Sequence, residues 1–467
     1  MHNNQLHGKI LACFYAAYLL IAGGICVFMT PPFQVADEPN HFMRVVQIAQ
    51  GEIFMHRRSP TEVGSNLPQS IALMPETFNP IKFHPQVKVT PDEFNQALQL
   101  KWASPPAFVA LSNTDLYPPT SYLGSVLAVK IARHFNILPL ATFYFARLGN
   151  LIVDGAIGII ALLLAGEAGG FILLVLALPM SISLTASCSQ DGMMLALSAL
   201  LAGCLLHFSK TPHKIWNKWL VLALGIAIGC LAAGKAPYIA LLPIVWLFGS
   251  RQTIKPITFI SVLSLGLFLF WAIFDIHGAQ VSFGLPNVSA SGQISFLLHH
   301  KLHAIKMFTL GTINDLGSNP GKITFIGCLG WLDTVFHRIF YQIAYLSLAL
   351  VFINSFFIQS PKLLSKTFAL KLVLFLGFVF VSYDLIFLAL YITWTPVGLN
   401  DIQGPQGRYF LPLIMMFALL PRLAPKYGHS TALYARYFAP RLEILLLFAF
   451  MIYSTCSLFN VLSSRYW

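Results

Sequence analysis

Apolar stretches, most of them close to twenty residues long, recur along almost the whole chain, and that length is sufficient to cross a bilayer as a helix. The first covers 10–29, and ten more follow at 141–165, 170–187, 192–208, 217–233, 236–249, 257–275, 336–357, 368–392, 409–421 and 442–461. Of the 467 residues, 57% are hydrophobic and only 10% are charged, whereas soluble domains carry about 25% charged residues. The sequence therefore predicts an all-α, polytopic membrane protein, with residues 1–467 forming one transmembrane domain.

The distribution of basic residues predicts the orientation of these spans. Lysine and arginine are concentrated in four links, 210–218, 251–255, 362–371 and 422–441. The positive-inside rule places these links in the cytoplasm, together with the N-terminus. Eleven spans then alternate correctly, provided that 119–136 is a re-entrant or interfacial helix and does not cross. The net charge of +12 follows from these links and does not indicate a nucleic-acid partner.

Two large segments are consequently predicted on the outer face of a cytoplasmic membrane, about 30–140 and about 276–335. The first begins directly after the first span, and Asp37-Glu38-Pro39 is typical of a helix start because an acidic cap precedes proline in the first turn. The helix is expected to run to about Gln50 and to stop at Gly51. Three side chains then share one face at i, i+4 and i+7, namely Asp37, His41 and Arg44. An acid, an imidazole and a guanidinium in one stripe suit a reaction centre, although a helix cap with a surface ion pair explains the same pattern.

Further polar groups are predicted at the outer ends of other spans. Asp191 lies in Ser187-Cys188-Ser189-Gln190-Asp191-Gly192, between two apolar helices, where it also suits a helix cap. Lys235 lies in Gly234-Lys235-Ala236-Pro237-Tyr238, and a lysine at such a place tends to pair or to bind an anion. Arg408 opens a later span and suits a bidentate phosphate contact. Arg147 is a fourth basic group on this side, although a single interfacial arginine commonly only anchors its helix.

The order of these motifs resembles the GT-C superfamily of integral-membrane glycosyltransferases, and more closely a large bacterial family of uncharacterised, predicted multipass proteins assigned to that superfamily. The resembling residues are spread from about 31 to 412. They are Pro32-Phe33 through Arg44 with Gly51, Tyr117-Pro118-Pro119-Thr120-Ser121-Tyr122, Arg147, Ser187 to Asp191, Lys235-Ala236-Pro237-Tyr238, Gly330-Trp331-Leu332-Asp333, and Gln406-Gly407-Arg408-Tyr409-Phe410-Leu411-Pro412.

The resemblance implies transfer of a sugar from a polyprenyl-phosphate carrier to a glycan, lipid or protein acceptor on the outer face of the membrane. It places an aspartate that serves as a base or an acceptor-orienting group at Asp37 or Glu38, and the face shared with His41 and Arg44 favours Asp37. His41 is included with them among the expected catalytic residues. Asp191 matches a second, assisting acid. The groups expected to hold the donor phosphate are Arg44, Arg147, Lys235, Arg408 and Tyr409. Some members of the superfamily need a divalent metal, but most users of polyprenyl monophosphates do not, so no metal or other cofactor is predicted.

Two other classes of function use the same residues. A transporter or flippase for an anionic, lipid-linked sugar holds its binding groups at the bilayer midplane on broken helices, whereas the clusters here are predicted at the outer ends of spans. A non-catalytic partner in cell-envelope assembly leaves the Asp37 stripe replaceable. The transferase is the favoured hypothesis, and the sugar, the acceptor and the stereochemical outcome are not encoded in any recognisable motif.

Overall fold

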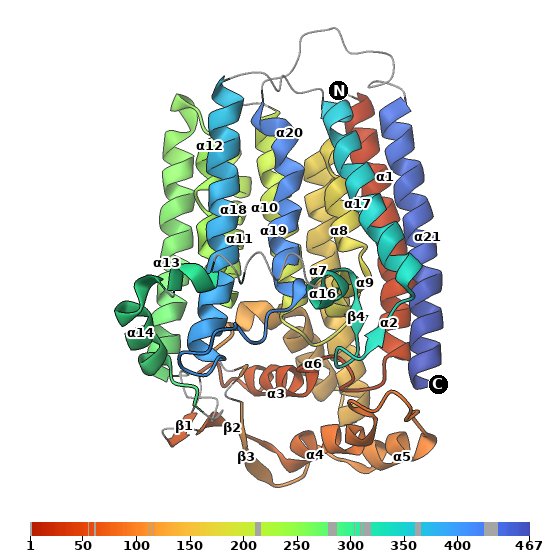
Figure 1. The fold of residues 1–467 in the computed structure, drawn as a ribbon. Helices are drawn as coiled ribbons and strands as arrows, with labels where there is room; N and C mark the ends of the chain where they lie inside the picture. The colour runs from red at the N-terminus through yellow and green to blue at the C-terminus, as the bar shows by residue number, and fades with distance from the viewer. Residues whose placement is uncertain are drawn as a thin grey trace.

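The computed structural model describes residues 2–54, 56–59, 62–111, 113–114, 116–210, 216–278, 287–302, 304–308, 311, 319–359, 366–424 and 438–467. Long helices run side by side through most of the molecule, and shorter elements cover one end of the bundle (Figure 1). Within the described residues, seven helical segments are long and apolar enough to cross a membrane. They are α1 and α2 (His2–Tyr18 and Gly24–Met29, joined by the π-helical turn η1, Leu19–Gly23), α7 (Pro139–Ala165), α10 (Asp191–Ser209), α13 (Ile254–Gly278), α17 (Arg338–Gln359), α18 (Lys366–Thr393) and α21 (Ala439–Tyr466).

The other four predicted spans are shorter or divided helices within the same bundle. They are α8 with α9 (Gly170–Leu176 and Pro179–Thr185), α11 (Lys218–Gly234), η5 with α12 (Ala236–Leu241 and Ile244–Leu247), and the series η7, α19, η8 and α20 (Gly407–Phe410, Leu411–Met415, Met416–Leu419 and Leu420–Leu423). Three of the breaks have a proline beside them, Pro179, Pro243 or Pro412, which cannot donate the helical hydrogen bond. The polytopic, all-helical class is confirmed.

The ends of the helices are arranged as the charge pattern predicts. The start of α1 and the starts of α13 and α18, next to the basic links, lie together at the top of Figure 1. The opposite end, which carries residues 30–140, is called the loop end below. The segment predicted as a re-entrant or interfacial helix folds as η3 (Pro119–Tyr122) and α6 (Leu123–His134). Twelve residues reach only about 18 Å, too short to cross. The side of the membrane that the loop end faces remains a prediction.

The loop end is built mainly from the segment between α2 and α7. It contains α3 (Glu38–Ala49), α4 (Gln69–Thr77), η2 (Asn79–Ile81) and α5 (Pro91–Gln99). It also contains an antiparallel sheet, in the order β1-β2-β3, formed by His56–Ser59, Glu62–Pro68 and Pro106–Ala110. The second segment contributes α14 (Ala290–His299), α16 (Asn319–Ile326) and the hairpin of β4 and β5 (Cys328–Leu329 and Thr334–Val335). The three-stranded sheet was not predicted from the sequence.

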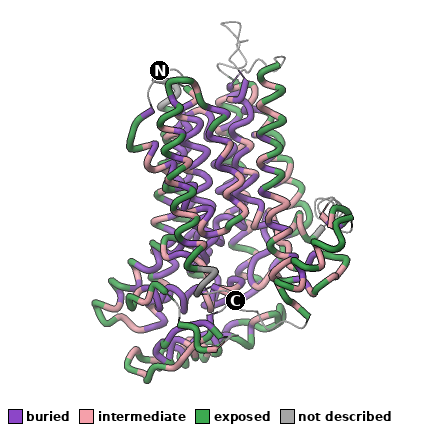
Figure 2. Tube along the Cα trace, turned by 90° about the vertical axis from the view of Figure 1, so that its left-hand side faces the viewer, coloured by how far each residue is buried: buried purple, intermediate pink, exposed green. Residues whose placement is uncertain are grey.

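The last turn of α21 fixes the two large segments of the loop end to the bundle. Arg465 donates hydrogen bonds to the carbonyl oxygens of Ile81 and Val87, at 2.9 and 3.1 Å, and pairs with the Asp333 carboxylate at 2.9 Å. Buried residues fill the interior of the bundle and continue into the loop end (Figure 2). The two large segments therefore pack onto the helices, which gives side chains at the loop end defined positions.

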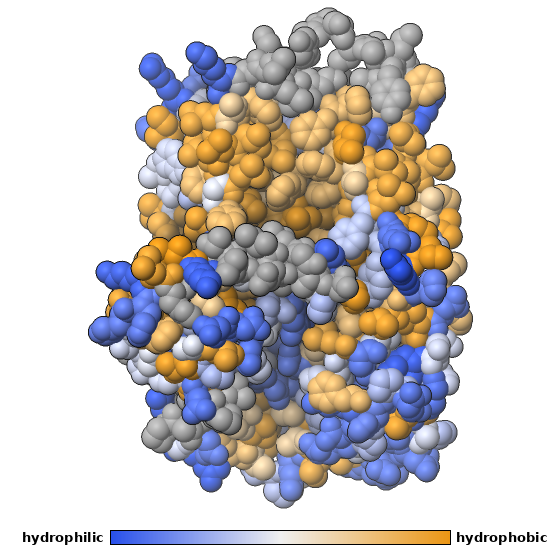
Figure 3. Space-filling model, viewed as in Figure 1, coloured by the Kyte–Doolittle hydropathy of each residue, from blue (hydrophilic) through white to orange (hydrophobic). Residues whose placement is uncertain are grey.

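The surface of the bundle has two features relevant to a lipid ligand. The helices carry a broad apolar band, below which the loop end is mostly hydrophilic (Figure 3). In the same view the apolar band is hollowed between α18 and α17. A lipid chain requires an apolar surface of this kind, because burial of each CH₂ group contributes about 0.8 kcal/mol.

Candidate active site

The helix that follows the first span begins where the sequence predicts, but its first acid does not cap it. Asp37 precedes α3 with φ at 63°, in the left-handed region, and its side chain makes no capping hydrogen bond. Aspartate tolerates this conformation better than most residues. The carboxylate, 44% exposed, is therefore free of the backbone and is directed to other side chains.

Arg408 joins two of the predicted acids. Its Nη2 atom lies 3.0 Å from Oδ2 of Asp37, and its Nε atom lies 3.7 Å from Oδ2 of Asp191. The Arg408 side chain is only 5% exposed, so the guanidinium is held between one accessible and one buried carboxylate. Residues from the first large segment and from the start of η7 thus meet in one place.

Lys235 completes the group from the opposite side of Asp191. Its Nζ atom lies 2.6 Å from Oδ1 of Asp191 and 4.2 Å from the centre of the Tyr409 ring. Lys235 directly follows α11, and Asp191 is the first residue of α10, so both charges sit at helix ends. Asp37, Asp191, Lys235 and Arg408 are called the charged cluster below. The charged cluster consists of two carboxylates and two cationic side chains, so its formal net charge is zero.

A close backbone contact explains the glycine in the Gln406-Gly407-Arg408 motif. A Cβ atom at Gly407 would lie 2.2 Å from the backbone nitrogen of Phe325, so only glycine allows α16 to pack here. The Gly407 amide donates to Oγ1 of Thr324 at 2.8 Å. The hydroxyl of Tyr238 donates to the Tyr409 carbonyl at 2.9 Å and fixes the other side of the turn. Arg408 is therefore held by packing from both directions.

His41 lies beside the charged cluster and is buried. Its Nδ1 atom is 2.8 Å from the Tyr122 hydroxyl, and its ring stacks against Tyr117 at 5.9 Å between centroids. Burial lowers the pKa of His41 to about 4, although the Asp37 and Asp191 carboxylates act in the opposite direction. The imidazole is consequently neutral at pH 7. Tyr117 and Tyr122 were not assigned a role from the sequence, although both lie in the Tyr-Pro-Pro-Thr-Ser-Tyr motif.

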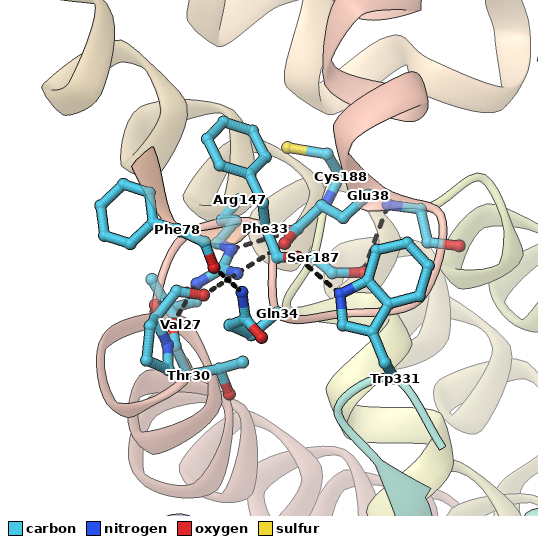
Figure 4. Close-up of polar contacts among 12 residues, drawn as sticks. Val27, Thr30, Phe33, Gln34, Glu38, Phe78, Arg147, Ser187, Cys188 and Trp331 are labelled. Carbon is cyan, nitrogen blue, oxygen red and sulfur yellow. Dashed lines mark hydrogen bonds and ion pairs between the residues drawn. The ribbon is translucent and has the colours of Figure 1, made fainter. Parts of the chain in front are cut away.

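Glu38 and Arg147 form a separate pair, away from solvent (Figure 4). Nε and Nη2 of Arg147 donate to the two Glu38 carboxylate oxygens at 2.8 and 2.6 Å, and both side chains are fully buried. Nη1 and Nη2 also donate to the carbonyl oxygens of Val27, Thr30 and Pro31. These bonds occupy all the donors of a guanidinium. The pair thus fastens α7 to the turn that leads into α3.

Arg44 is likewise engaged within the protein. It is fully buried, and its guanidinium donates to Oε1 of Gln47 at 2.7 Å and to the carbonyl oxygens of Ile53 and Tyr117 at 3.1 and 3.2 Å. The predicted stripe on α3 is therefore divided. Asp37 belongs to the charged cluster and His41 lies beside it, whereas Arg44 links α3 to the segments that follow it.

The described residues include two acids in the charged cluster, Asp37 and Asp191. Within the described part of the chain, no group of three or more histidine, cysteine, aspartate or glutamate side chains is arranged to hold a metal ion. The charged cluster contains two carboxylates, and both are paired with cations. Independence of a metal remains a prediction.

Together, the fold and the site define a polytopic membrane protein with an ionised cluster at the loop end. The chain belongs to a family described as predicted membrane protein (DUF2142), which it matches over residues 20–417. It matches no curated protein. Among solved structures it is similar to the archaeal oligosaccharyltransferase AglB from Archaeoglobus fulgidus, in complex with an inhibitory peptide and a dolichol-phosphate, with 12% identity and a TM-score of 0.34. The match covers 97% of this chain and 56% of AglB, so the chain spans little more than half the length of that protein.

Proposed function

We propose that the protein is a membrane glycosyltransferase, which moves a sugar from a polyprenyl-phosphate donor to a glycan, lipid or protein acceptor at the loop end. The observation that carries this proposal is the pairing of the accessible Asp37 carboxylate with the buried Arg408 guanidinium, 3.0 Å apart. A base for the acceptor and a cation for the leaving phosphate are thus adjacent. Both are needed when a hydroxyl group displaces a phosphate from a sugar.

The positions of the charges along the helices favour a transferase over a transporter. Asp191 begins α10, Lys235 follows α11, and Arg408 lies in η7, which precedes α19. A transporter places its binding groups near the bilayer midplane. Here the ionised groups gather at helix ends, next to the large segment that covers the bundle. This arrangement supports chemistry at the membrane surface.

Each member of the charged cluster has a distinct part in the proposed reaction. The oxygen of the acceptor hydroxyl forms a bond to the anomeric carbon, and Asp37 accepts the proton of that hydroxyl. The bond from that carbon to the phosphate oxygen breaks, and the electron pair remains on the phosphate. Arg408 and Lys235 stabilise the negative charge that develops there, because fixed cations in a site of low polarity act strongly on such charge. Asp191 orients both cations.

The contacts separate the predicted site residues into those proposed to take part in the reaction and those that position them. All the donors of Arg147 are directed to protein oxygens, Arg44 donates to three protein oxygens, and Glu38 has both oxygens bound by Arg147. We assign these three residues to positioning, and we assign the donor phosphate to Arg408 and Lys235 with Tyr409 beside them. Of the two adjacent acids, Asp37 is the proposed base. His41 is also assigned to positioning, because its neutral ring bonds Tyr122 and its amide donates to the Asp37 carbonyl at 3.1 Å.

The lipid part of the donor needs an apolar surface that reaches the loop end. The hollow in the apolar band between α18 and α17 offers such a surface (Figure 3). A polyprenyl chain placed there keeps its phosphate at the boundary between the apolar band and the hydrophilic loop end. Because a phosphate binds arginine bidentately, it competes with Asp37 for Arg408 and releases that carboxylate toward the acceptor.

A turnover assay tests the proposal. The purified protein in nanodiscs is supplied with a panel of radiolabelled polyprenyl-phosphate sugars, and release of sugar from the lipid is measured. We expect release with at least one donor, and its loss in Arg408→Ala. Asp92→Asn, an exposed carboxylate on α5, is the control. Donor binding without release by the wild-type protein, together with movement of the donor across a bilayer, would replace the transferase by a flippase.

A further inference from the structure

A pocket at the loop end lies beside the turn that precedes α3 and the first turn of that helix. Its volume is about 240 Å³. Three parts of the chain form its polar wall: the turn before α3 and its first turn, the region of η2, and the β4–β5 hairpin. The residues used in the argument are Gln34, Asn40, Glu76, Asn79, Lys82 and Trp331. None of them belongs to the proposed reaction described above.

Gln34 brings an unsatisfied hydrogen-bond acceptor to this pocket. Its Nε2 atom donates to the Phe78 carbonyl at 3.0 Å, whereas its Oε1 atom is buried and has no partner among the described residues. Figure 4 shows the amide nitrogen turned toward Phe78 and the oxygen turned away from it. A buried acceptor without a donor costs roughly 1–3 kcal/mol. A ligand hydroxyl group would remove that cost.

The remaining wall combines polar groups with aromatic surface. Asn79 donates to Glu76 at 3.0 Å, and Nζ of Lys82 lies 3.5 Å from the centre of the Trp331 ring. Since one carboxylate faces one ammonium group, the wall carries no net charge, and it favours a neutral ligand with several hydroxyl groups. The volume is below the range of about 300–1,000 Å³ that drug-sized ligands occupy, so the pocket suits one ring.

The pocket is close to the proposed base along the chain. Pro39 and Asn40 line it, and they follow Asp37 by two and three residues in the first turn of α3. Burial lowers the pKa of Lys82, which also lines the pocket, and the Asp37 carboxylate acts in the opposite direction.

We propose that this pocket binds one neutral, hydroxyl-rich saccharide unit of the acceptor, with Gln34 Oε1 accepting a hydroxyl hydrogen and Trp331 forming an aromatic wall. That the bound saccharide is an acceptor rests on the proposed transferase function, whereas saccharide binding in the pocket does not depend on it. It makes a saccharide the acceptor class of this enzyme. A protein or a simple lipid without sugar would then be a poor acceptor.

Binding is tested without turnover, by saturation-transfer NMR of methyl glycosides with the purified protein. The probes are the methyl glycosides of glucose, galactose, mannose and N-acetylglucosamine. Asn79→Trp places an indole at the exposed rim, and Asn95→Trp makes the same change at an exposed position of α5. We expect at least one glycoside to bind wild type and Asn95→Trp, and its signal to fall at least fivefold in Asn79→Trp. Binding to none of the glycosides, or equal binding to both variants, overturns the proposal.

Turnover then separates the two proposals. If the wild-type protein transfers sugar, Asn79→Trp should raise the KM for a saccharide acceptor about tenfold or more, while release of donor sugar to water stays unchanged. An unchanged KM contradicts the acceptor pocket and leaves the transferase standing. Pocket-dependent glycoside binding without any sugar release contradicts the transferase and leaves the saccharide site standing.

Discussion

Oδ2 of Asp37 lies 3.0 Å from Nη2 of Arg408, although the two residues are 371 positions apart in the chain. The pair joins the first helix of the loop end to the start of η7, and it places an accessible carboxylate against a buried cation. Asp191 holds the other edge of the same guanidinium. The charged cluster is therefore a tertiary assembly, and each of its members can be tested separately.

Replacement of Arg408 by lysine should reduce sugar release by about 10²–10³-fold, the range observed when one stabilising donor is removed from a transition state. Lysine keeps the charge but cannot contact Asp37, Asp191 and a phosphate in the fork-like geometry of arginine. The measurement is kcat with a radiolabelled donor. Arg338→Lys, at an exposed position beginning α17, is the matched control. Equal activity of Arg408→Lys and wild type would contradict the assigned contact.

Asp191→Asn should increase the affinity for free polyprenyl phosphate. The Asp191 carboxylate lies 2.6 Å from Nζ of Lys235 and 3.7 Å from Nε of Arg408, and it offsets their positive charge. Its loss therefore leaves the charged cluster with one additional net positive charge. We expect Kd to fall about tenfold at low salt, which corresponds to about 1.4 kcal/mol. Fluorescence titration with a labelled polyprenyl phosphate measures it, and Asp92→Asn serves as control. If Asp191→Asn binds polyprenyl phosphate more weakly than wild type, the prediction is wrong.

His41 should make the protein less stable as the pH falls from about 6.5 to 4. Burial lowers its pKa to about 4 in the folded protein, while the unfolded chain keeps the ordinary value of about 6.5. The unfolded state therefore binds more protons within this window, and stability decreases on acidification by up to about 3 kcal/mol. His41→Gln removes the titration and should flatten the curve of Tm against pH. His134→Gln, at an exposed site, should retain the wild-type slope. Identical slopes in all three proteins would exclude a depressed pKa.

Glu38→Gln should impair folding before it affects chemistry. Arg147 would then be a buried cation without its counter-ion, and breaking a buried ion pair typically costs 3–5 kcal/mol. The readouts are Tm in detergent and the yield of monodisperse protein, with the exposed Glu62→Gln as control. The double variant Glu38→Gln with Arg147→Met should recover part of the loss. A stable Glu38→Gln protein that lacks only turnover would indicate a catalytic role for Glu38 instead.

Features set by local sequence were predicted well, and α3 is the clearest example. The Asp-Glu-Pro start and the glycine after Gln50 fix a helix whose observed bounds are Glu38–Ala49. Helical periodicity also placed His41 on the face of Asp37. The spans 170–187 and 409–421 were expected to be single helices, but Pro179 and Pro412 lie where they divide. Hydropathy alone does not detect such breaks.

The partners of the charged residues could not be predicted. Glu38 bonds Arg147 across 109 positions, and only the three-dimensional packing of α7 decides that both are buried. The sequence left Asp37 and Glu38 as equal candidates by family pattern, and the structure separates them by exposure. Tyr122 and Tyr238 were visible within motifs, yet their hydrogen bonds to His41 and to the Tyr409 carbonyl are long-range contacts.

Asp37 is the proposed base of a sugar transfer from a lipid phosphate. The most direct measurement compares Asp37→Asn with wild type in two assays, equilibrium binding of a polyprenyl-phosphate sugar and release of its sugar to an acceptor. We expect Asp37→Asn to bind the donor at least as tightly as wild type, because Arg408 loses a competing anion. We expect kcat to fall by at least about 10²-fold, the lower bound for loss of a general base. Full sugar release by Asp37→Asn would contradict this role for Asp37.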